Sequence, residues 1–198
     1  QYPKRLDPVV LPWVTVWLGL AYLTRNDSLV FAVLIWSYLA WATFKQKADR
    51  KSLWPLLAAL AVYLLFVVGQ SLFQYLYYGA WLPNTYALKL TGMPLPDRLR
   101  DGVGFVTPFL LATAFILVLP IVDFILDRRA PKFLLLAIVW SAIGYQIYVG
   151  GDPWNYWRIM SPTIPLAAIL FISALAAFAR ARSAASMATS ALSRFFIA

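Results

Sequence analysis

The residues best suited to chemistry lie in a short polar stretch, 150–158, between two long apolar runs. It reads Gly-Gly-Asp-Pro-Trp-Asn-Tyr-Trp-Arg, so it holds an acid (Asp152), a base (Arg158), an amide and three aromatic side chains. Arginine binds phosphate through paired N–H donors, and aromatic rings stack on sugar or isoprenoid groups. The stretch therefore predicts a site for a lipid phosphate or a lipid-linked sugar at a membrane surface.

A second set of candidate residues follows the helix-breaking Pro83 in the polar segment 79–102. Asn84 or Thr85 fits a helix N-cap, and residues 86–90 then predict a short helix lying in the membrane interface. The two prolines in residues 93–98 predict a turn that closes the segment. Lysine and arginine side chains at this level supply charge for an anionic headgroup. The residues that we predict to bind substrate are Asp152, Arg158, Asn84, Thr85, Lys89 and Arg25.

Each of these residues also has a purely structural interpretation. The acid and the base of 150–158 can pair with each other or cap the following helix. The amide and hydroxyl after Pro83 can form an ordinary N-cap, and Lys89 can simply extend its ammonium group to the membrane surface. Arg25 can close its own turn with Asp27. Both interpretations stay open from the sequence alone.

The elements that must hold these residues are membrane-spanning helices. The chain is 62% hydrophobic and only 13% charged, whereas a soluble domain is about half apolar and a quarter charged. The apolar residues fall in blocks of about twenty, not in the alternating ten-residue strands of a membrane barrel. The sequence predicts an all-α integral membrane protein with six transmembrane helices. The predicted spans are 8–24, 29–44, 53–78, 103–126, 133–149 and 159–179.

The basic residues assign the two sides of the membrane. They gather in alternate connections, at 4–5, 45–51, 128–132 and 180–182. Because cytoplasmic loops are enriched in Lys and Arg, this pattern predicts both termini in the cytoplasm. It also predicts that 25–28, 79–102 and 150–158 lie on the outer face of the cell inner (plasma) membrane. In the cytoplasmic turn, we expect Asp123 and Asp127 to neutralise Arg128 and Arg129.

Two domains are predicted from this pattern. Residues 1–179 form the six-span transmembrane domain, and residues 180–198 form a cytoplasmic tail. Small apolar residues and Phe195 recur at helical spacing in this tail, which predicts a weakly amphipathic helix on the membrane surface.

Composition excludes several classes of function. The chain has no Cys, no His and no Glu, which excludes disulfides, thiol and histidine chemistry, and the usual zinc sites. Any acid–base or metal chemistry must use its eight aspartates; no metal site or cofactor is assigned, and a divalent cation is left open. The net charge of +9 is explained by topology and anionic lipids, so nucleic acid is not expected as a partner. No span has an ionisable residue at its centre, which argues against an ion pump.

Three motifs resemble a known family. Residues 77–89 read Tyr-Tyr-Gly-Ala-Trp-Leu-Pro-Asn-Thr-Tyr-Ala-Leu-Lys, which resembles the YYG-x-x-LPNT-Y-x-x-K stretch of GT-C fold polyprenyl-phosphate-sugar glycosyltransferases. The mycobacterial terminal arabinofuranosyltransferases and their bacterial relatives are the most similar group. Gly150-Gly151-Asp152, followed by Arg158 and Pro162, is similar to the family's GGD…R…P segment. Residues 24–27 are similar to its TRP-[DE] turn, with Asn26 in place of the usual proline.

The resemblance implies an inverting transferase that moves a sugar from a polyprenyl phosphate donor to an acceptor on the outer face. Its partners would be membrane lipids and the polyprenyl-phosphate-linked sugar, and Asp152 and Arg158 would belong to the donor or acceptor site. In that family the catalytic aspartate lies in the first outer loop of a longer chain. No opening span here carries an Asp-rich loop, and the sequence begins with Gln1. We therefore expect this chain to be the central or C-terminal part of such a protein, with the catalytic residue outside it.

An alternative from a different class fits the same features. A transferase-derived chain without its catalytic loop can serve as a non-catalytic transmembrane subunit of a larger complex, binding lipid and neighbouring helices. The aromatic-rich helices are compatible with packing against other membrane subunits. An enzyme requires an aspartate-bearing loop upstream in the full gene, whereas a structural subunit requires protein partners that cover its spans.

Overall fold

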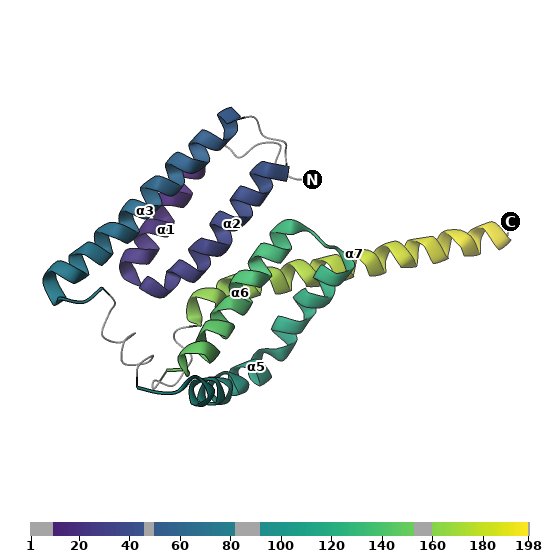
Figure 1. The fold of residues 1–198 in the computed structure, drawn as a ribbon. Helices are drawn as coiled ribbons and strands as arrows, with labels where there is room; N and C mark the ends of the chain where they lie inside the picture. Colours follow the sequence, from purple (N-terminus) through teal and green to yellow (C-terminus); the bar gives the residue numbers. More distant parts are fainter. Residues whose placement is uncertain (1–9, 46–49, 82–91, 153–159, 198) are drawn as a thin grey trace. The chain divides into compact units, whose positions relative to one another are not determined.

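The structure, a computed structural model, describes residues 10–45, 50–81, 92–152 and 160–197, and the side chains of these ranges except 50–52 and 184–197. Every regular element in these ranges is a helix (Figure 1). The elements are α1 (Val10–Thr24), η1 (Asn26–Ser28), α2 (Leu29–Lys45), α3 (Arg50–Tyr78), α5 (Leu95–Leu126), α6 (Ala130–Val149), η2 (Ser161–Thr163) and α7 (Ile164–Ile197). The all-α prediction is confirmed for the part of the chain that is described.

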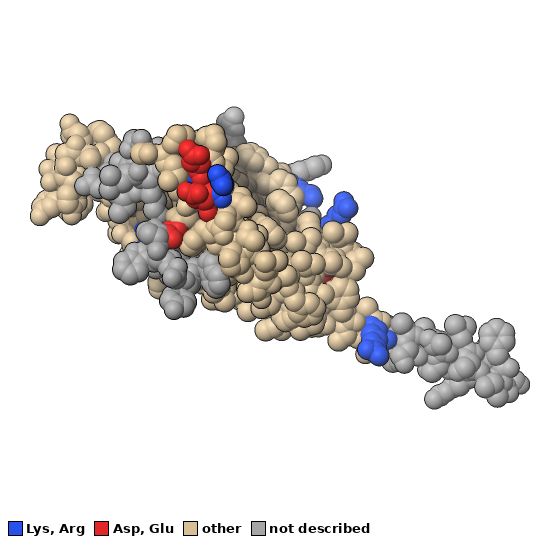
Figure 2. All heavy atoms as spheres, turned by 90° about the horizontal axis from the view of Figure 1, so that it is seen from below, with Lys and Arg blue, Asp and Glu red and all other residues tan. Residues whose placement is uncertain are grey.

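Five segments are long and apolar enough to cross a membrane. They are Asn26–Lys45, Leu53–Tyr78, Leu95–Leu126, Ala130–Val149 and Ser161–Ser183. Helix α1 is apolar but has only 15 residues, about 22 Å at 1.5 Å per residue, against a hydrocarbon layer of about 30 Å. A multi-pass membrane protein is thus confirmed, while six spans and cytoplasmic termini stay predictions. Figure 2 shows the expected surface, where charged side chains form only a few small clusters among other residues.

The start of α5 differs from its prediction. The fourth span was expected to begin at residue 103, with residues 93–98 forming a turn, but the helix begins at Leu95. Pro96 is compatible with a first helical turn, where its missing N–H has no helical partner to lose. Asp97 lies in the same turn, where a carboxylate complements the positive end of the helix dipole. Arg98 therefore belongs to a helix and not to a loop.

Helix α7 also differs from the expected pattern. It runs without a break from Ile164 to Ile197 and extends past α5 and α6 (Figure 1). The predicted tail helix at 180–198 is therefore the end of α7 and not a separate element, and its place on the membrane surface stays a prediction. The short interfacial helix predicted at 86–90 lies outside the described residues.

The described contacts divide the chain into two compact units, residues 1–94 and residues 95–198. In unit 1, α1 packs along α3, and the core includes Leu11, Trp36 and Tyr63. In unit 2, α5 packs along α6 and against α7, and the core includes Val106 and Ile143. Each unit has its own core, so each can position its own polar residues.

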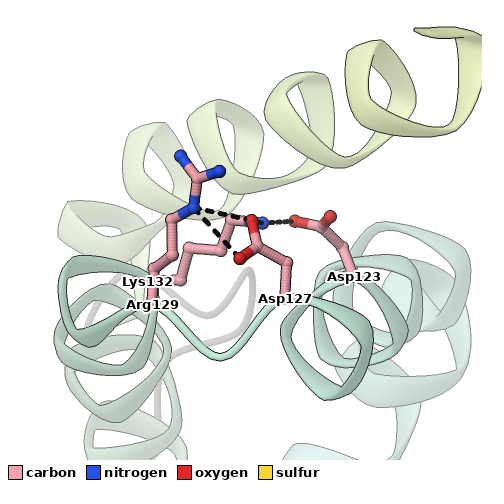
Figure 3. Close-up of polar contacts among 4 residues, drawn as sticks. All are labelled: Asp123, Asp127, Arg129 and Lys132. Atoms are coloured by element: carbon pink, nitrogen blue, oxygen red, sulfur yellow. Dashed lines mark hydrogen bonds and ion pairs between the residues drawn. The ribbon is translucent and has the colours of Figure 1, made fainter. Parts of the chain in front are cut away.

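At one end of unit 2, four charged side chains connect α5 to α6 (Figure 3). Lys132 Nζ lies 2.6 Å from Asp123 Oδ2 and 3.1 Å from Asp127 Oδ2. Arg129 Nε lies 2.8 Å from Asp127 Oδ2. The expected pairing of Asp127 with an arginine is confirmed, but Asp123 pairs with Lys132, because Lys132 lies in the first turn of α6 beside the end of α5. We call these four residues the ionic clasp.

Candidate functional site

Of the six predicted substrate-binding residues, the structure describes two. Asn84, Thr85, Lys89 and Arg158 lie outside the described residues. Arg25 donates from Nε to Asp27 Oδ1 at 3.0 Å and from Nη2 to Asp27 Oδ2 at 2.6 Å, which is the turn-closing pair of the structural interpretation. Asp152 is partly buried and follows the C-terminal end of α6 in unit 2. The site is therefore built from Asp152 and its surroundings.

The two glycines before Asp152 end helix α6. Gly150 and Gly151 both adopt left-handed backbone conformations, with φ of 84° and 83°. The Gly151 N–H donates to the Gln146 carbonyl at 2.8 Å, and the Gly150 N–H donates to the Ile147 carbonyl at 3.3 Å. This pair of bonds is the Schellman arrangement, which requires a residue that tolerates positive φ just past the helix. The glycines therefore fix the direction in which the chain leaves α6 toward Asp152.

The same region is packed closely against the first turns of α5. A Cβ at Gly102 would collide with the backbone carbonyl of Ile147, and a Cβ at Gly151 would lie 2.7 Å from Phe105 Cβ. A Cβ at Gly150 would lie 3.5 Å from the Cα of Arg98. The start of α5 can therefore lie against the end of α6, because Gly102 in α5 and Gly151 just after α6 have no side chain. We call this end of unit 2 the glycine end.

Arg98 is buried at the glycine end, with only 8% of its surface exposed. It lies on the same helical face as Gly102 and Val106, both of which are buried, because residues four apart share a face. Its guanidinium carbon lies 5.3 Å from the centroid of the Tyr148 ring. Its Nε and Nη1 atoms are buried and have no hydrogen-bond partner. Arginine remains charged in proteins, so this is a buried positive charge with unused donors.

Arg98 also lacks an ionic partner within the described part of the chain. Asp97 and Asp101 are its sequence neighbours, but both are exposed and neither pairs with it. Lys132, another described cation of unit 2 that is shielded from solvent, is neutralised by two carboxylates. A buried charge without a counterion costs several kcal/mol. Arg98 is therefore a position where an anion from outside these residues would stabilise the protein.

Gln146 is a second unsatisfied polar group at the same end. Its side chain is fully buried, and neither Oε1 nor Nε2 has a hydrogen-bond partner in the structure. It lies on the face of α6 that also carries the buried Ile143 and Val139. A buried amide without partners costs about 1–3 kcal/mol. An amide can both donate to and accept from a hydroxyl group, so Gln146 suits a hydroxyl-bearing ligand or an ordered water.

Neither Arg98 nor Gln146 was predicted as a site residue from the sequence, although a signal was available for each. Arg98 stands four residues before Gly102, which would have placed it on a packed helical face had the helix been extended to residue 95. In residues 142–149, Gln146 is the one polar side chain besides two tyrosines. A polar residue inside a membrane span favours a functional role. Assigning 93–98 to a turn hid the first signal.

The comparisons with known proteins found no relative. No family model, curated protein or solved structure matches the chain. The resemblance to GT-C transferases therefore depends on the sequence motifs at 24–27, 77–89 and 150–162 and stays a prediction. Within the described residues, no three acidic side chains gather as ligands for a metal ion.

Proposed function

We propose that this chain is part of a membrane glycosyltransferase that moves a sugar from a polyprenyl phosphate donor to an acceptor on the outer face of the plasma membrane. The observation that supports this most directly is the packing of the Gly150-Gly151-Asp152 motif on the first turns of α5. This packing puts a carboxylate at the same end of a membrane helix bundle as a buried guanidinium and a buried amide. These are the groups that bind phosphates and sugar hydroxyls.

The reaction assigns limited roles to this chain. In an inverting transfer, the acceptor oxygen attacks the anomeric carbon while the bond to the donor phosphate breaks and the phosphate leaves with its electron pair. Asp152 would accept a hydrogen bond from a sugar hydroxyl, and Arg158 would contact the phosphate. The base that removes the acceptor proton is proposed to lie outside these residues, and Arg25 is used in its pair with Asp27.

The test is transfer by the full protein in liposomes, with polyprenyl-phosphate arabinofuranose as the donor that the resemblance implies. Asp152→Asn and Arg158→Ala should each abolish transfer or donor binding while the protein still inserts into the membrane. Arg128→Ala is the matched control, because Arg128 is exposed and lies at the opposite end of unit 2. Wild-type turnover in either site variant would show that the replaced residue does not belong to the site. A wild-type protein that neither binds nor transfers the donor would favour the non-catalytic subunit.

A further inference from the structure

We propose that Arg98 is the main ligand of an anion site at the glycine end, and that this site takes a phosphate group. The inference depends on the burial and the unused donors of Arg98, and not on the transfer reaction proposed above. It assigns a function to a residue outside the three motifs. Three observations support it: the unpaired charge with its unused donors, the helix end on which it lies, and its level in the membrane.

The first observation is that the rest of the unit does not compensate the charge. The guanidinium carbon lies over the Tyr148 ring, and such a contact stabilises a cation by about 0.5–2 kcal/mol. The ring supplies no negative charge to neutralise the guanidinium. The in-plane donors on Nε and Nη1 remain without partners. Each of these donors can make a charge-assisted hydrogen bond to a phosphate oxygen.

The second observation is the position of Arg98 in the first turn of α5. The first N–H groups of a helix have no partner within the helix, and the helix dipole is positive there. A cation in this turn is unfavourable by itself, and an anion there is favourable. Asp97 supplies one negative charge, but its side chain is exposed and does not pair with Arg98. An anion bound at Arg98 would therefore interact with both the guanidinium and the helix end.

The third observation is the level of the site in the membrane. Arg98 lies within one turn of the start of a membrane-spanning segment, Leu95–Leu126. The anions present at that level of a bilayer are the phosphates of lipids, and basic residues at helix ends bind them. Gln146 adds an unsatisfied side-chain amide in the last turn of α6, at the same end of unit 2. A phosphate ester with a hydroxyl-bearing group uses both kinds of donor.

The experiment compares farnesyl phosphate with farnesol, which differ only in the phosphate, in equilibrium titrations of the full protein in detergent. We expect the wild type to bind farnesyl phosphate at least about tenfold more tightly than farnesol. Arg98→Gln should lose this difference, and Arg98→Lys should keep part of it because the charge remains. Arg100→Gln is the matched control: Arg100 is an exposed arginine in the same turn, and its loss should change affinity by less than about twofold.

Competition by inorganic phosphate identifies the source of the anion. Displacement of farnesyl phosphate by inorganic phosphate would show that the site accepts the free ion, and no displacement would show that the phosphate must arrive on a lipid.

The melting temperature without ligand separates binding from folding, because removal of an unpaired buried charge should not lower it. Equal affinity of Arg98→Gln and the wild type for farnesyl phosphate would overturn the proposal. So would a lowered melting temperature in Arg98→Gln together with unchanged binding in Arg98→Lys. Neither result depends on sugar transfer.

Discussion

Arg98 and Lys132 are two shielded cations in one helical unit, and they differ in whether the described residues supply a counterion. Lys132 lies between two carboxylates and is neutralised within the unit. Arg98 has a tyrosine ring beside it and unused donors. A residue with a structural role needs its counterion in the folded chain, whereas a residue of a binding site needs it only with the ligand. This contrast separates the ionic clasp from the glycine end.

The clasp gives a prediction about stability. Lys132→Met removes the partner of Asp123, whose side chain is only 8% exposed, and leaves a buried carboxylate unpaired. We expect this to lower the free energy of unfolding by about 3 kcal/mol. Arg129→Gln, the control, removes a pair whose arginine is 67% exposed, and should cost less than about 1 kcal/mol. Denaturant unfolding of the purified protein in detergent measures both.

A double variant tests whether the cost arises from the unpaired carboxylate. Asp123→Asn combined with Lys132→Met removes both charges of the pair. It should recover most of the stability that Lys132→Met loses, because no buried charge remains without a partner. A double variant as unstable as the single one would show that Lys132 acts through packing of its methylene chain.

The clasp also predicts a dependence on pH. Hydrogen bonds from Lys132, and in addition from Arg129, hold the pKa of the Asp127 carboxyl below its ordinary value of 3.8. A carboxyl with a lowered pKa in the folded state stabilises the fold above its unfolded pKa, and this contribution is lost as pH falls through the folded pKa. The melting temperature should therefore decrease as the pH is lowered below about 4. In Asp127→Asn the fall should be smaller, and an identical pH profile in that variant would contradict this origin.

At the scale of the elements, the α5–α6 contact depends on a missing side chain. A Cβ at Gly102 collides with the Ile147 carbonyl, whereas a Cβ at Gly104 meets nothing within 4 Å. Gly102→Ala should therefore destabilise the protein by about 1–3 kcal/mol, through displacement of the two helices. Gly104→Ala, two residues away in α5, should be neutral or stabilising by up to about 1 kcal/mol, because alanine favours the helix. Thermal unfolding of the two variants side by side measures the difference.

The same pair of variants connects the element to the site. Displacement of α5 would move Arg98 away from Tyr148, so Gly102→Ala should also weaken farnesyl phosphate binding, and Gly104→Ala should not. Weakened binding in both variants would mean that the effect does not come from the α5–α6 contact.

The sequence predicted where several helices end better than where they begin, and it did not predict the packed site. Long apolar runs placed the ends of α1 and α3 at residues 24 and 78, because hydrophobicity alone determines which residues enter a membrane. The start of α5 was wrong because two prolines suggested a turn, although proline is also compatible with a first helical turn. The pairing of α5 with α6 depends on contacts between distant residues, so the spacing from Gly102 can place Arg98 on a packed face of α5 but cannot show that α6 covers it.

For the molecule as a whole, the number of membrane spans depends on whether the short helix α1 crosses the bilayer. Five segments are long enough to cross the bilayer, and α1 is about 8 Å short of the hydrocarbon thickness. A short helix can still cross if the bilayer thins locally, at a modest cost per ångström. The basic clusters predict that α1 crosses the membrane, because with six spans every basic cluster lies on the same side. Five spans would leave residues 4–5 on the opposite side from the other clusters.

Cysteine labelling tests this topology, and the chain, which has no cysteine of its own, is a clean background. Met93→Cys and Arg100→Cys are exposed positions in the predicted outer segment 79–102, so a membrane-impermeant maleimide should label both in intact cells. Arg128→Cys and Ser183→Cys should be labelled only after permeabilisation. Gln1→Cys then decides between six spans and five, because its side depends on whether α1 crosses. Labelling of Gln1→Cys in intact cells would show that α1 does not span the membrane, and the outer placement of the glycine end would be unaffected, since it depends on α5, α6 and α7.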